Sequence, residues 1–260
     1  KFFGLKNPGI FIQILRGGYD GVIIHGYTSV TTFFAYAAAL VSKTPMFFRG
    51  ETIVRQHSSR IRSAIKRIFV KRFFSHIQGN FYIGTESKKF FKHYDIPTDK
   101  LFFTPYSVDN DYFQRCSRQL ADADTLKTEL YGQNKPVILY VAKLIDRKRP
   151  LDLLKASQNI HGDVLIVFVG EGTLRKEMEQ YIRKNGITNI VLKGFVNQSE
   201  LPRYYASADI FILPSEYESF GLVINEAMCF GLPIITTKGV ASAVDLVKEN
   251  GMIYPVGDIA

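Results

Sequence analysis

The chain has 260 residues, a length that accommodates two domains of ordinary size. Its apolar content of 46% is typical of a globular protein, and no run approaches the roughly eighteen apolar residues that span a bilayer. Residues 1–119 hold 18 Lys and Arg against seven Asp and Glu, a net charge of +11, whereas residues 120–260 hold 15 against 17, a net charge of −2. This asymmetry predicts two domains with different functions.

The number and spacing of the cysteines bear on the cellular compartment and on metal binding. The two cysteines, Cys116 and Cys229, lie far apart and form no metal-type spacing. This pattern excludes a disulfide-rich scaffold and predicts a reducing, cytoplasmic environment. The sequence opens in an apolar-basic stretch at Lys1 and stops at Ala260 in what reads as the start of another helix. We therefore expect an N-terminal portion and the final helices to be missing.

Short apolar runs alternate with helical patterns along the whole chain. In the first half we expect strands at 21–25, 46–49, 81–84 and 101–104, and helices at 29–42, 60–77 and 86–93. In the second half we expect strands at 137–141, 164–169, 190–192, 210–213 and 234–236, and helices at 151–157, 173–185, 200–208 and 220–230. Such alternation predicts parallel sheets with helices on both faces.

The alternation breaks around residues 105–135, where Pro105, Asp109 and Asn110 interrupt it. We therefore expect an α/β protein with two doubly wound parallel-sheet domains, at residues 1–115 and 116–260. Ligands of such sheets bind at the carboxyl ends of the strands, which directs attention to the residues that follow each strand.

Two carboxylates, Glu218 and Glu226, bracket the segment that says most about function. The segment follows the expected strand 210–213 and continues into a helix, so the carboxylates lie roughly 12 Å apart along the helix axis. That is about the length of a nucleotide diphosphate-sugar from ribose to hexose. Backbone N–H groups of the first turn, at Phe220, Gly221 and Leu222, have no intrahelical partner and favour a phosphate. The plainer interpretation is two solvated helix glutamates.

A cluster of cations follows the expected strand 137–141. Four of the seven residues from Lys143 to Arg149 are Lys or Arg, including Lys148. At the carboxyl end of a strand these side chains could neutralise a diphosphate. The alternative is a solvated basic loop, which the sequence alone favours equally.

Glycine turns follow the next two strands. Gly170 and Gly172 open a helix after strand 164–169, but Arg175 stands where a dinucleotide fingerprint needs a third small residue. We therefore expect a tight turn whose backbone faces the ligand cleft. After strand 190–192, the backbone of Phe195 and Val196 could border a nucleotide base.

The basic first half offers weaker candidates. His25 ends the first strand and Glu51 follows the second, so either could face an acceptor hydroxyl; a structural histidine is equally consistent with His25. Residues 52–94 hold ten Lys or Arg and a single acid, Glu86. This charge predicts either a solvated basic helix face or docking to an anionic membrane through residues 55–92. Nucleic acid is a less favoured partner, because no recognition motif accompanies the charge.

The chain resembles the retaining GT-B glycosyltransferases of glycosyltransferase family 4, also named glycosyl transferases group 1. The stretch from Pro214 to Ile234, with Glu218 and Glu226, is similar to the family's E-x7-E motif. Further similarity covers the glycine turn at 169–172, the segments 191–196 and 204–209, and the basic pair Lys143 and Lys148. The segment 105–113 resembles the family's inter-domain segment.

This resemblance implies two Rossmann-like domains and a role for each matched residue. Glu218 would hold hydroxyls of the donor sugar, and Lys143 and Lys148 would stabilise the leaving diphosphate. Glu226 would bind the ribose. The remaining donor-binding positions implied or expected are Ser219, Phe220, Gly221, Leu222, Gly170, Gly172, Phe195 and Val196. The resemblance also implies that no divalent metal is needed, so no metal or cofactor is expected.

The chain departs from the family pattern at two places in the basic loop. Ala142 and Lys143 replace the usual Gly-Arg pair, and a lysine cannot make the bidentate fork of an arginine. Arg149 stands where glycine is common. The family's N-terminal glycine-rich loop is not found in the sequence.

The sequence therefore predicts a cytoplasmic glycosyltransferase, peripheral to the inner membrane face, that moves a hexosyl group from a nucleotide-sugar to a glycan or lipid-linked acceptor with retention. Cell-envelope polysaccharide synthesis is the expected setting. The alternatives are a non-catalytic nucleotide-sugar-binding subunit and another GT-B enzyme, such as a nucleotide-sugar epimerase or a phosphorylase.

Overall fold

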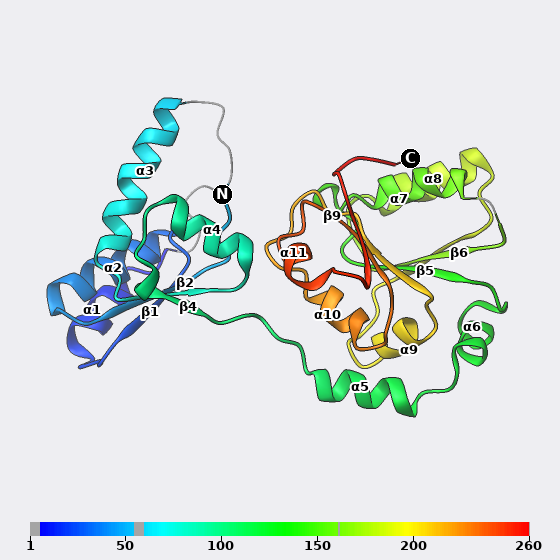
Figure 1. Ribbon diagram of the computed structural model, residues 1–260, viewed down its shortest axis with the longest axis horizontal. Coiled ribbons are helices and arrows are strands. Elements are labelled where there is room, and N and C mark those ends of the chain that lie inside the picture. Colours follow the sequence, from blue (N-terminus) through cyan, green and yellow to red (C-terminus); the bar gives the residue numbers. More distant parts are fainter. Residues whose placement is uncertain (1–5, 55–59, 161, 260) are drawn as a thin grey trace. The chain divides into compact units, whose positions relative to one another are not determined.

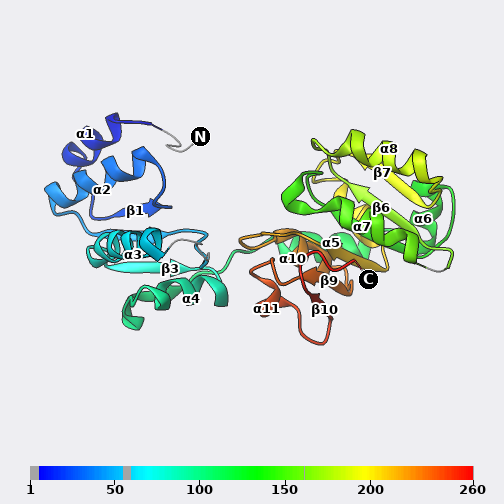
Figure 2. The same cartoon turned by 90° about the horizontal axis from the view of Figure 1, so that it is seen from above.

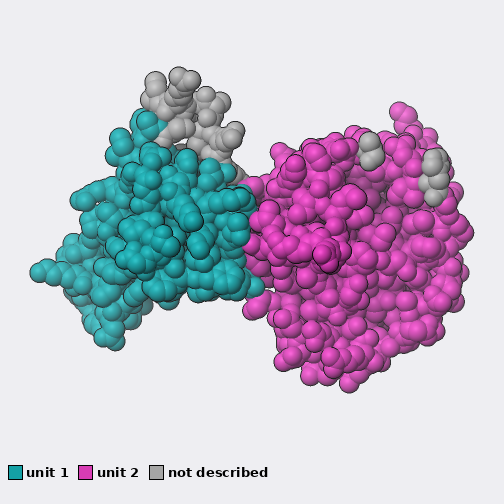
Figure 3. Space-filling view, in the orientation of Figure 1, with its two compact units in different colours: residues 1–106 teal, residues 107–260 magenta. Residues whose placement is uncertain are grey.

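The computed structural model describes residues 6–54, 60–160 and 162–259. It divides into two compact units, unit 1 (Lys1–Tyr106) and unit 2 (Ser107–Ala260), which Figure 3 colours separately. The sequence predicts a boundary after residue 115, whereas the division falls after Tyr106. The reason is helix α5 (Asn110–Gln119), which packs on α9 (Leu201–Ala206) and buries Phe113 in the core of unit 2.

Unit 1 is built on a parallel sheet with the strand order β1-β2-β3-β4. Its strands are β1 (Val22–His25), β2 (Met46–Arg49), β3 (Gly79–Tyr82) and β4 (Leu101–Phe103). Its helices are α1 (Gly9–Arg16), α2 (Val30–Ser42), α3 (Arg60–Ser75) and α4 (Thr85–His93), with the 3-10 turn η1 (Thr98–Lys100) before β4. The Ser29 hydroxyl caps α2 by accepting the backbone N–H of Thr32 at 3.1 Å.

The strand order places the connecting helices of unit 1 on one face. Each crossover from β1 to β4 steps in the same direction, and such crossovers are right-handed, so α2, α3 and α4 lie on one side of the sheet (Figure 1). Figure 2 shows them spread along the sheet, from α2 near β1 to α4 beyond β3. The core between the two layers combines Ile24 and Phe48 of the strands with Phe73, Phe74 and Phe91 of the helices.

The opposite face of the same sheet is also apolar. It carries Ile23, Phe47, Phe81 and Phe102, and the rings of Phe47 and Phe81 stack with centroids 6.1 Å apart. Ile23 and Phe102 are exposed, and none of the four belongs to the core that the described helices bury. The described strands of unit 1 are thus wound in one direction only.

Unit 2 contains a parallel sheet with the strand order β10-β9-β8-β5-β6-β7. Its strands are β5 (Val137–Val141), β6 (Leu165–Val169), β7 (Ile190–Gly194), β8 (Ile210–Leu213), β9 (Ile234–Thr237) and β10 (Gly251–Tyr254). Besides α5 and α9, its helices are α6 (Ala123–Tyr131), α7 (Pro150–Ala156), α8 (Arg175–Asn185), α10 (Leu222–Met228) and α11 (Ala243–Leu246), with 3-10 turns η2 (Asp146–Lys148) and η3 (Ser157–Asn159).

This second sheet is wound in both directions. The chain proceeds from β5 to β6 and β7, then returns to place β8 on the other side of β5 and continues outward to β9 and β10. Successive strand residues therefore face two cores, with Leu139 and Val167 in one and Tyr140 and Phe168 in the other. The α/β fold with two groups of parallel strands, predicted from the alternation, is confirmed.

Several element boundaries differ from the sequence predictions. Strand β3 occupies Gly79–Tyr82 instead of 81–84, because Gly79 pairs with Phe47 of β2 and Phe81 with Arg49. The segment 105–135 contains α5 and α6, whose first turns are capped by the carboxylates of Asp109 and Asp122. Helices α1 and α11 and strand β10 have no counterpart among the predicted elements.

Candidate functional site

The order in which the strands of unit 2 are added to the sheet reverses between β5 and β8. This reversal marks the expected position of a ligand site. The two strands pair through Ile138 with Ile210 and Leu139 with Phe211. The loops at their carboxyl ends are therefore neighbours, and ligands of doubly wound sheets bind at this point. The loop after β5 carries Lys143 and Lys148, and the loop after β8 carries Glu218. Three of the predicted residues thus belong to the two loops at one switch point.

The two loops hold each other by direct contacts. The backbone N–H of Glu216 donates to the Arg147 carbonyl at 2.9 Å, and the Arg147 guanidinium donates to the Tyr217 carbonyl at 2.8 Å. The Lys148 ammonium donates to Oε2 of Glu218, and the Arg147 guanidinium lies 3.6 Å from the same oxygen. Lys148 and Glu218 are each only 13% exposed, so this is a largely desolvated ion pair.

Charge at Lys148 is tuned by its surroundings. Burial is the main cause that lowers the pKa of Lys148 to about 8, because it disfavours the charged form. The neighbouring cations Arg147 and Lys143 contribute to this shift by repelling the ammonium. The Glu218 carboxylate acts in the opposite direction through its ion pair. The site therefore has a lysine whose charge state changes in a moderately alkaline range.

A buried tyrosine, Tyr140, holds the basic loop by hydrogen bonds to its backbone. The Tyr140 hydroxyl lies 3.2 Å from the Lys143 carbonyl and 3.5 Å from the Lys148 carbonyl, and donates toward them. The Tyr140 side chain is fully buried in the core beneath the sheet. Anchoring both lysines to one core residue fixes the part of the loop that carries the cations.

The backbone around Glu218 is fixed on its other side by the loop after β9. The Glu218 N–H donates to the Gly239 carbonyl at 3.0 Å, and the Ala241 N–H donates to the Glu218 carbonyl at 2.9 Å. A Cβ at Gly239 would lie 2.2 Å from the Glu216 carbonyl oxygen, so this close approach requires glycine. With its backbone bonded on both sides, Glu218 has little freedom to turn away from Lys148.

The segment after Glu218 differs from the prediction of a helix starting at Phe220. Gly221 has φ +92 and interrupts the helix, so α10 begins at Leu222 and ends at Met228 instead of Phe230. Phe220 is buried, and its carbonyl accepts the Ser242 hydroxyl. Only Leu222 of the three predicted N–H donors belongs to the helix, while Ser219, Phe220 and Gly221 form the turn that leads into it.

Glu226 lies in α10 and is held by a residue that the sequence analysis missed. The Tyr205 hydroxyl donates to Oε2 of Glu226 at 2.7 Å, and the Tyr205 ring stacks on Phe230 at 5.5 Å. Burial raises the pKa of Glu226, and the Tyr205 hydrogen bond partly offsets this shift. The signal was the tyrosine pair at 204–205, but only the fold shows which ring reaches the carboxylate.

Glycines connect the loops after β5, β6 and β7. A Cβ at Gly170 would lie 2.0 Å from the Ala142 carbonyl oxygen, and one at Gly172 would lie 2.2 Å from the Leu144 carbonyl oxygen. The Gly170 N–H donates to the Gly194 carbonyl at 2.8 Å. These glycines thus allow backbone-to-backbone packing beside Lys143. After β7, the Phe195 side chain is exposed and Val196 packs against the core.

Arg149, at the position where the family commonly has glycine, adopts a left-handed conformation with φ +50. Its guanidinium donates from Nε to Asp152 at 2.5 Å and lies 3.7 Å from Glu216. A backbone angle that suits glycine is therefore kept by a charged residue with two acidic neighbours.

The predicted acceptor-side residues belong to unit 1. His25 is exposed at the end of β1 and lines a cavity of about 450 Å³ that follows β1 between α1 and α2. Glu51 accepts the Tyr106 hydroxyl at 2.9 Å, and the Arg49 guanidinium lies 5.1 Å from the Tyr106 ring centroid. Their acceptor role stays a prediction. The cavity is a feature of unit 1 and includes none of the residues around Lys148.

Across residues 6–54, 60–160 and 162–259, no three His, Cys, Asp or Glu side chains are grouped closely enough to hold a metal ion. Among the helices of that part of the chain, none is both long and apolar enough to cross a bilayer.

Chemically, the switch point combines cations, carboxylates and a glycine turn. Lys143, Arg147 and Lys148 supply positive charge for an anion. Glu218 and Glu226 supply acceptors for hydroxyl groups on either side of the turn at Gly221. A ligand with a central anion flanked by hydroxyl-bearing groups matches this order.

Comparison with known proteins gives consistent matches. The family described as Glycosyl transferases group 1 matches residues 124–260, more than half of the chain. Sulfoquinovosyl transferase SQD2 of Arabidopsis thaliana is 32% identical over 48% of this chain and 24% of its own length. O-antigen chain mannosyltransferase B of Escherichia coli is 28% identical over 64% of this chain and 44% of its own length. The chain thus spans less than half the length of these two curated relatives.

Solved structures share the fold. Anabaena Alr3699/HepE, crystallised in complex with UDP, matches 96% of this chain and 69% of its own chain with a TM-score of 0.79 and 18% identity. This likeness identifies the architecture as GT-B, with parallel sheets in two groups. Taken with the match over residues 124–260, it shows that the chain belongs to the group 1 glycosyl transferase family.

Proposed function

We propose that the protein transfers a sugar from a nucleotide diphosphate-sugar to an acceptor, with retention at the anomeric carbon, as in glycosyltransferase family 4. The observation that carries this proposal is the ion pair of Lys148 with Glu218 at the switch point, in the loop that leads into α10 and Glu226. Cations for a diphosphate and carboxylates for hydroxyls lie in the order that such a donor requires.

In this proposal each matched residue has a physical role. Lys143 and Lys148 bind the diphosphate and stabilise its charge as it leaves. Glu218 accepts hydroxyls of the donor sugar, and Glu226, oriented by Tyr205, accepts those of the ribose. The backbone of residues 219–222, the turn at Gly170 and Gly172, and the segment at Phe195 and Val196 enclose the nucleotide.

The reaction needs no protein nucleophile. The acceptor hydroxyl attacks the anomeric carbon on the face from which the diphosphate leaves, and the leaving phosphate takes the acceptor proton. The bond from the anomeric carbon to the phosphate oxygen breaks while the new glycosidic bond forms. Fixed cations act on the charge that develops on the leaving oxygen, which is the term with the largest effect in such sites.

The setting proposed is cell-envelope polysaccharide synthesis at the inner face of the membrane. The acceptor is a glycan or a lipid-linked glycan with a hexosyl group as the transferred sugar, and the basic residues of 55–92 attract the protein to anionic lipid. Residues 55–59 of this segment lie outside the described part. The name of one relative, an O-antigen chain mannosyltransferase, supports a glycan acceptor.

The test is calorimetric titration of UDP, GDP and ADP into the chain and into Glu226→Ala. UDP comes first because HepE was crystallised with UDP and with UDP-glucose. We expect one nucleotide to bind and the variant to lose at least about tenfold in affinity, because loss of one hydrogen-bonding charged group costs about 1.5 kcal/mol or more. Glu249→Ala, an exposed glutamate of unit 2, is the matched control.

Three outcomes would contradict the proposal or favour an alternative. Absence of binding by every nucleotide at millimolar concentration would contradict the donor site. Binding without release of free nucleotide diphosphate in the presence of acceptors would favour a non-catalytic nucleotide-sugar-binding subunit. Release of the nucleotide without any acceptor would favour a different GT-B enzyme, such as an epimerase.

A further inference from the structure

Helix α3 of unit 1 has two apolar faces. Val70, Phe73 and Phe74 are buried against the sheet. Ile65, Ile68 and Phe69 repeat the same spacing five residues earlier, which at 100° per residue turns them about 140° away from the buried set. They are 64%, 72% and 43% exposed. A surface helix of a globular domain needs only the first face.

The exposed face extends onto the neighbouring helix α2. The Phe33 ring lies 5.7 Å from the Phe69 ring in an edge-to-face arrangement, and Phe33 is itself 39% exposed. We call Phe33, Ile65, Ile68 and Phe69 the apolar stripe. Scattered exposed apolar residues need no explanation, but four that share one surface mark an interaction site.

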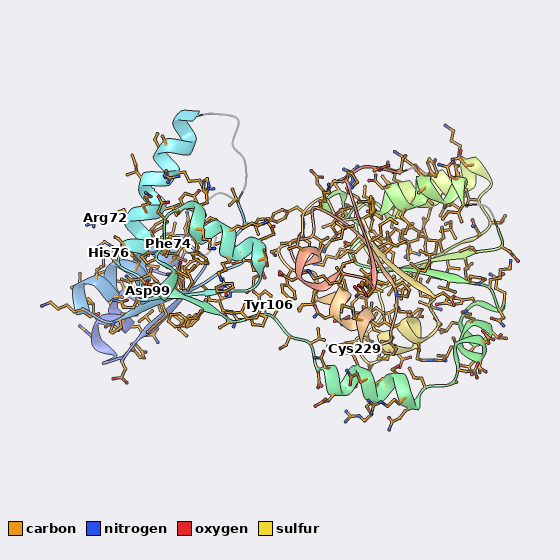
Figure 4. All side chains as sticks on the ribbon, viewed as in Figure 1. Arg72, Phe74, His76, Asp99, Tyr106 and Cys229 are labelled. Atoms are coloured by element: carbon orange, nitrogen blue, oxygen red, sulfur yellow. The ribbon has the colours of Figure 1, made fainter. Side chains whose placement is uncertain are left out.

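Cations border the apolar stripe. Arg67, Lys71 and Arg72 lie on the same helix, and Figure 4 places Arg72 on its outer side and Phe74 on its inner side. Asp95 pairs with both Arg67 and Lys71, at 2.7 and 2.6 Å, so two cations share one carboxylate. Residues 64–75 of α3 hold four Lys or Arg and no acid, so the helix keeps a positive charge beside Asp95. The surroundings of the stripe are thus positively charged.

We propose that α3 lies along the surface of an anionic lipid bilayer, with the apolar stripe inserted among the acyl chains and the bordering cations at the phosphates. Apolar side chains and cations on the exposed side of one helix are the pattern of an interfacial helix. The net positive charge of α3 matches anionic lipid better than an apolar protein surface, which supplies no negative charge.

This inference rests on the proposed function in one respect, since a lipid-linked acceptor gives the membrane contact its purpose. It goes beyond electrostatic attraction, because insertion fixes which helix enters the bilayer and survives salt. Screening shortens the reach of charge to about 3 Å at 1 M salt, whereas burial of apolar area is not screened.

A fluorescence experiment tests insertion directly, because the chain contains no tryptophan. Phe69→Trp supplies a single reporter in the apolar stripe, and Met252→Trp supplies a matched reporter at an exposed position of unit 2. With vesicles of phosphatidylglycerol and phosphatidylcholine in equal parts, we expect the emission of Phe69→Trp to shift to the blue and that of Met252→Trp to stay unchanged.

Vesicle flotation supplies the second readout. The double variant Ile65→Asn with Ile68→Asn should bind the same vesicles about tenfold more weakly, since transfer of two isoleucines into the interface contributes roughly 1.4 kcal/mol after partial burial. Met252→Asn, which is 64% exposed, should bind like the wild type. Wild-type binding should fall but persist at about 1 M salt.

The outcomes are separable from those of the donor site. No blue shift, or equal vesicle binding by the double variant, overturns the proposal. A stripe-dependent dimer seen by light scattering without lipid would assign the surface to a second copy and also overturns it. UDP titration of the double variant should match the wild type, because the stripe belongs to unit 1. Failure of UDP to bind wild type would leave the vesicle result standing.

Discussion

At the scale of single residues, the charge of Lys148 depends on pH in a moderately alkaline range. Its ammonium contacts Glu218, while burial and the cations Arg147 and Lys143 lower its pKa to about 8. In the unfolded chain a lysine keeps its ordinary pKa near 10.4. The folded state therefore carries a stability cost below pH 8 that is relieved as the pH rises from 8 toward 10.4, where the unfolded chain binds more protons.

The same shift predicts a pH dependence of nucleotide binding. A diphosphate needs the ammonium form, so the affinity for UDP should be level below pH 8 and fall by up to about tenfold between pH 8 and 9. In Lys148→Arg the fall should be absent, because a guanidinium stays charged throughout this range. Calorimetric titration from pH 7 to 9.5 measures both proteins. A level profile in the wild type would show that Lys148 does not hold the anion.

At the scale of elements, the loops after β5, β6 and β7 are bonded to one another. They are joined by hydrogen bonds from Ala142 to Val169, from Leu144 to Glu171 and from Gly170 to Gly194, all between backbone atoms. Side chains at the glycine positions would separate these loops. The position of the cations at Lys143 and Lys148 thus depends on backbone packing two strands away.

Replacing Gly170 tests this dependence. In Gly170→Ala the new methyl group would meet the Ala142 carbonyl, and we expect a loss of about 2 kcal/mol or more in the free energy of unfolding together with weaker UDP binding. Gly186→Ala is the matched control, since Gly186 has a positive φ but open space around its Cβ. It should lose about 1 kcal/mol and bind UDP normally. Chemical denaturation measures the free energy of unfolding, and calorimetric titration measures UDP affinity. Equal losses in Gly170→Ala and Gly186→Ala would refute the packing argument.

The elements that sequence patterns reveal are those with strong local signals. Buried strands such as β5 and β6 are uninterrupted apolar runs and were predicted within one residue. Helix α5 is polar overall and follows the turn-like Asp109, so it has few apolar residues by which the sequence alone would reveal a helix. The edge strand β10 has an apolar run of only three residues, Met252 to Tyr254, which is too short to mark a strand by itself.

Candidate site residues follow the same rule. Lys148 and Glu218 follow recognisable strands and could be proposed from the sequence. Tyr205, which orients Glu226, and Arg147, which binds the Tyr217 carbonyl, act through contacts between distant segments. Such contacts depend on strand order and helix length, which the local pattern does not specify. The roles of all four in catalysis stay predictions.

At the scale of the whole molecule, each unit has its own core. Unit 1 is closed by aromatic residues such as Phe48, Phe73 and Phe74, and unit 2 by two clusters on the two faces of its sheet. The residues proposed for the donor belong to unit 2, and the apolar stripe belongs to unit 1. The charge asymmetry of the sequence corresponds to this division of proposed tasks.

We therefore expect residues 107–260 to fold and to bind nucleotide alone. A doubly wound sheet of this size is an ordinary independent domain. The isolated segment should unfold in one cooperative transition and bind UDP within about threefold of the intact chain. Circular dichroism and calorimetry measure the two properties. An isolated segment that folds but binds at least tenfold more weakly would show that unit 1 contributes to the nucleotide site.

The contact of Lys148 with Glu218 also bears on how a donor enters and how a product leaves. The Lys148 ammonium already has an internal anion in Glu218, so an incoming diphosphate must exchange with that carboxylate. Once displaced, Glu218 keeps the Arg147 guanidinium nearby, and in the proposed function the sugar end of the donor supplies a further hydrogen-bond donor. After transfer, the nucleotide diphosphate product has no sugar to bind Glu218, so this carboxylate competes with the product for Lys148. This competition favours release of the product and restores the ion pair before the next donor binds.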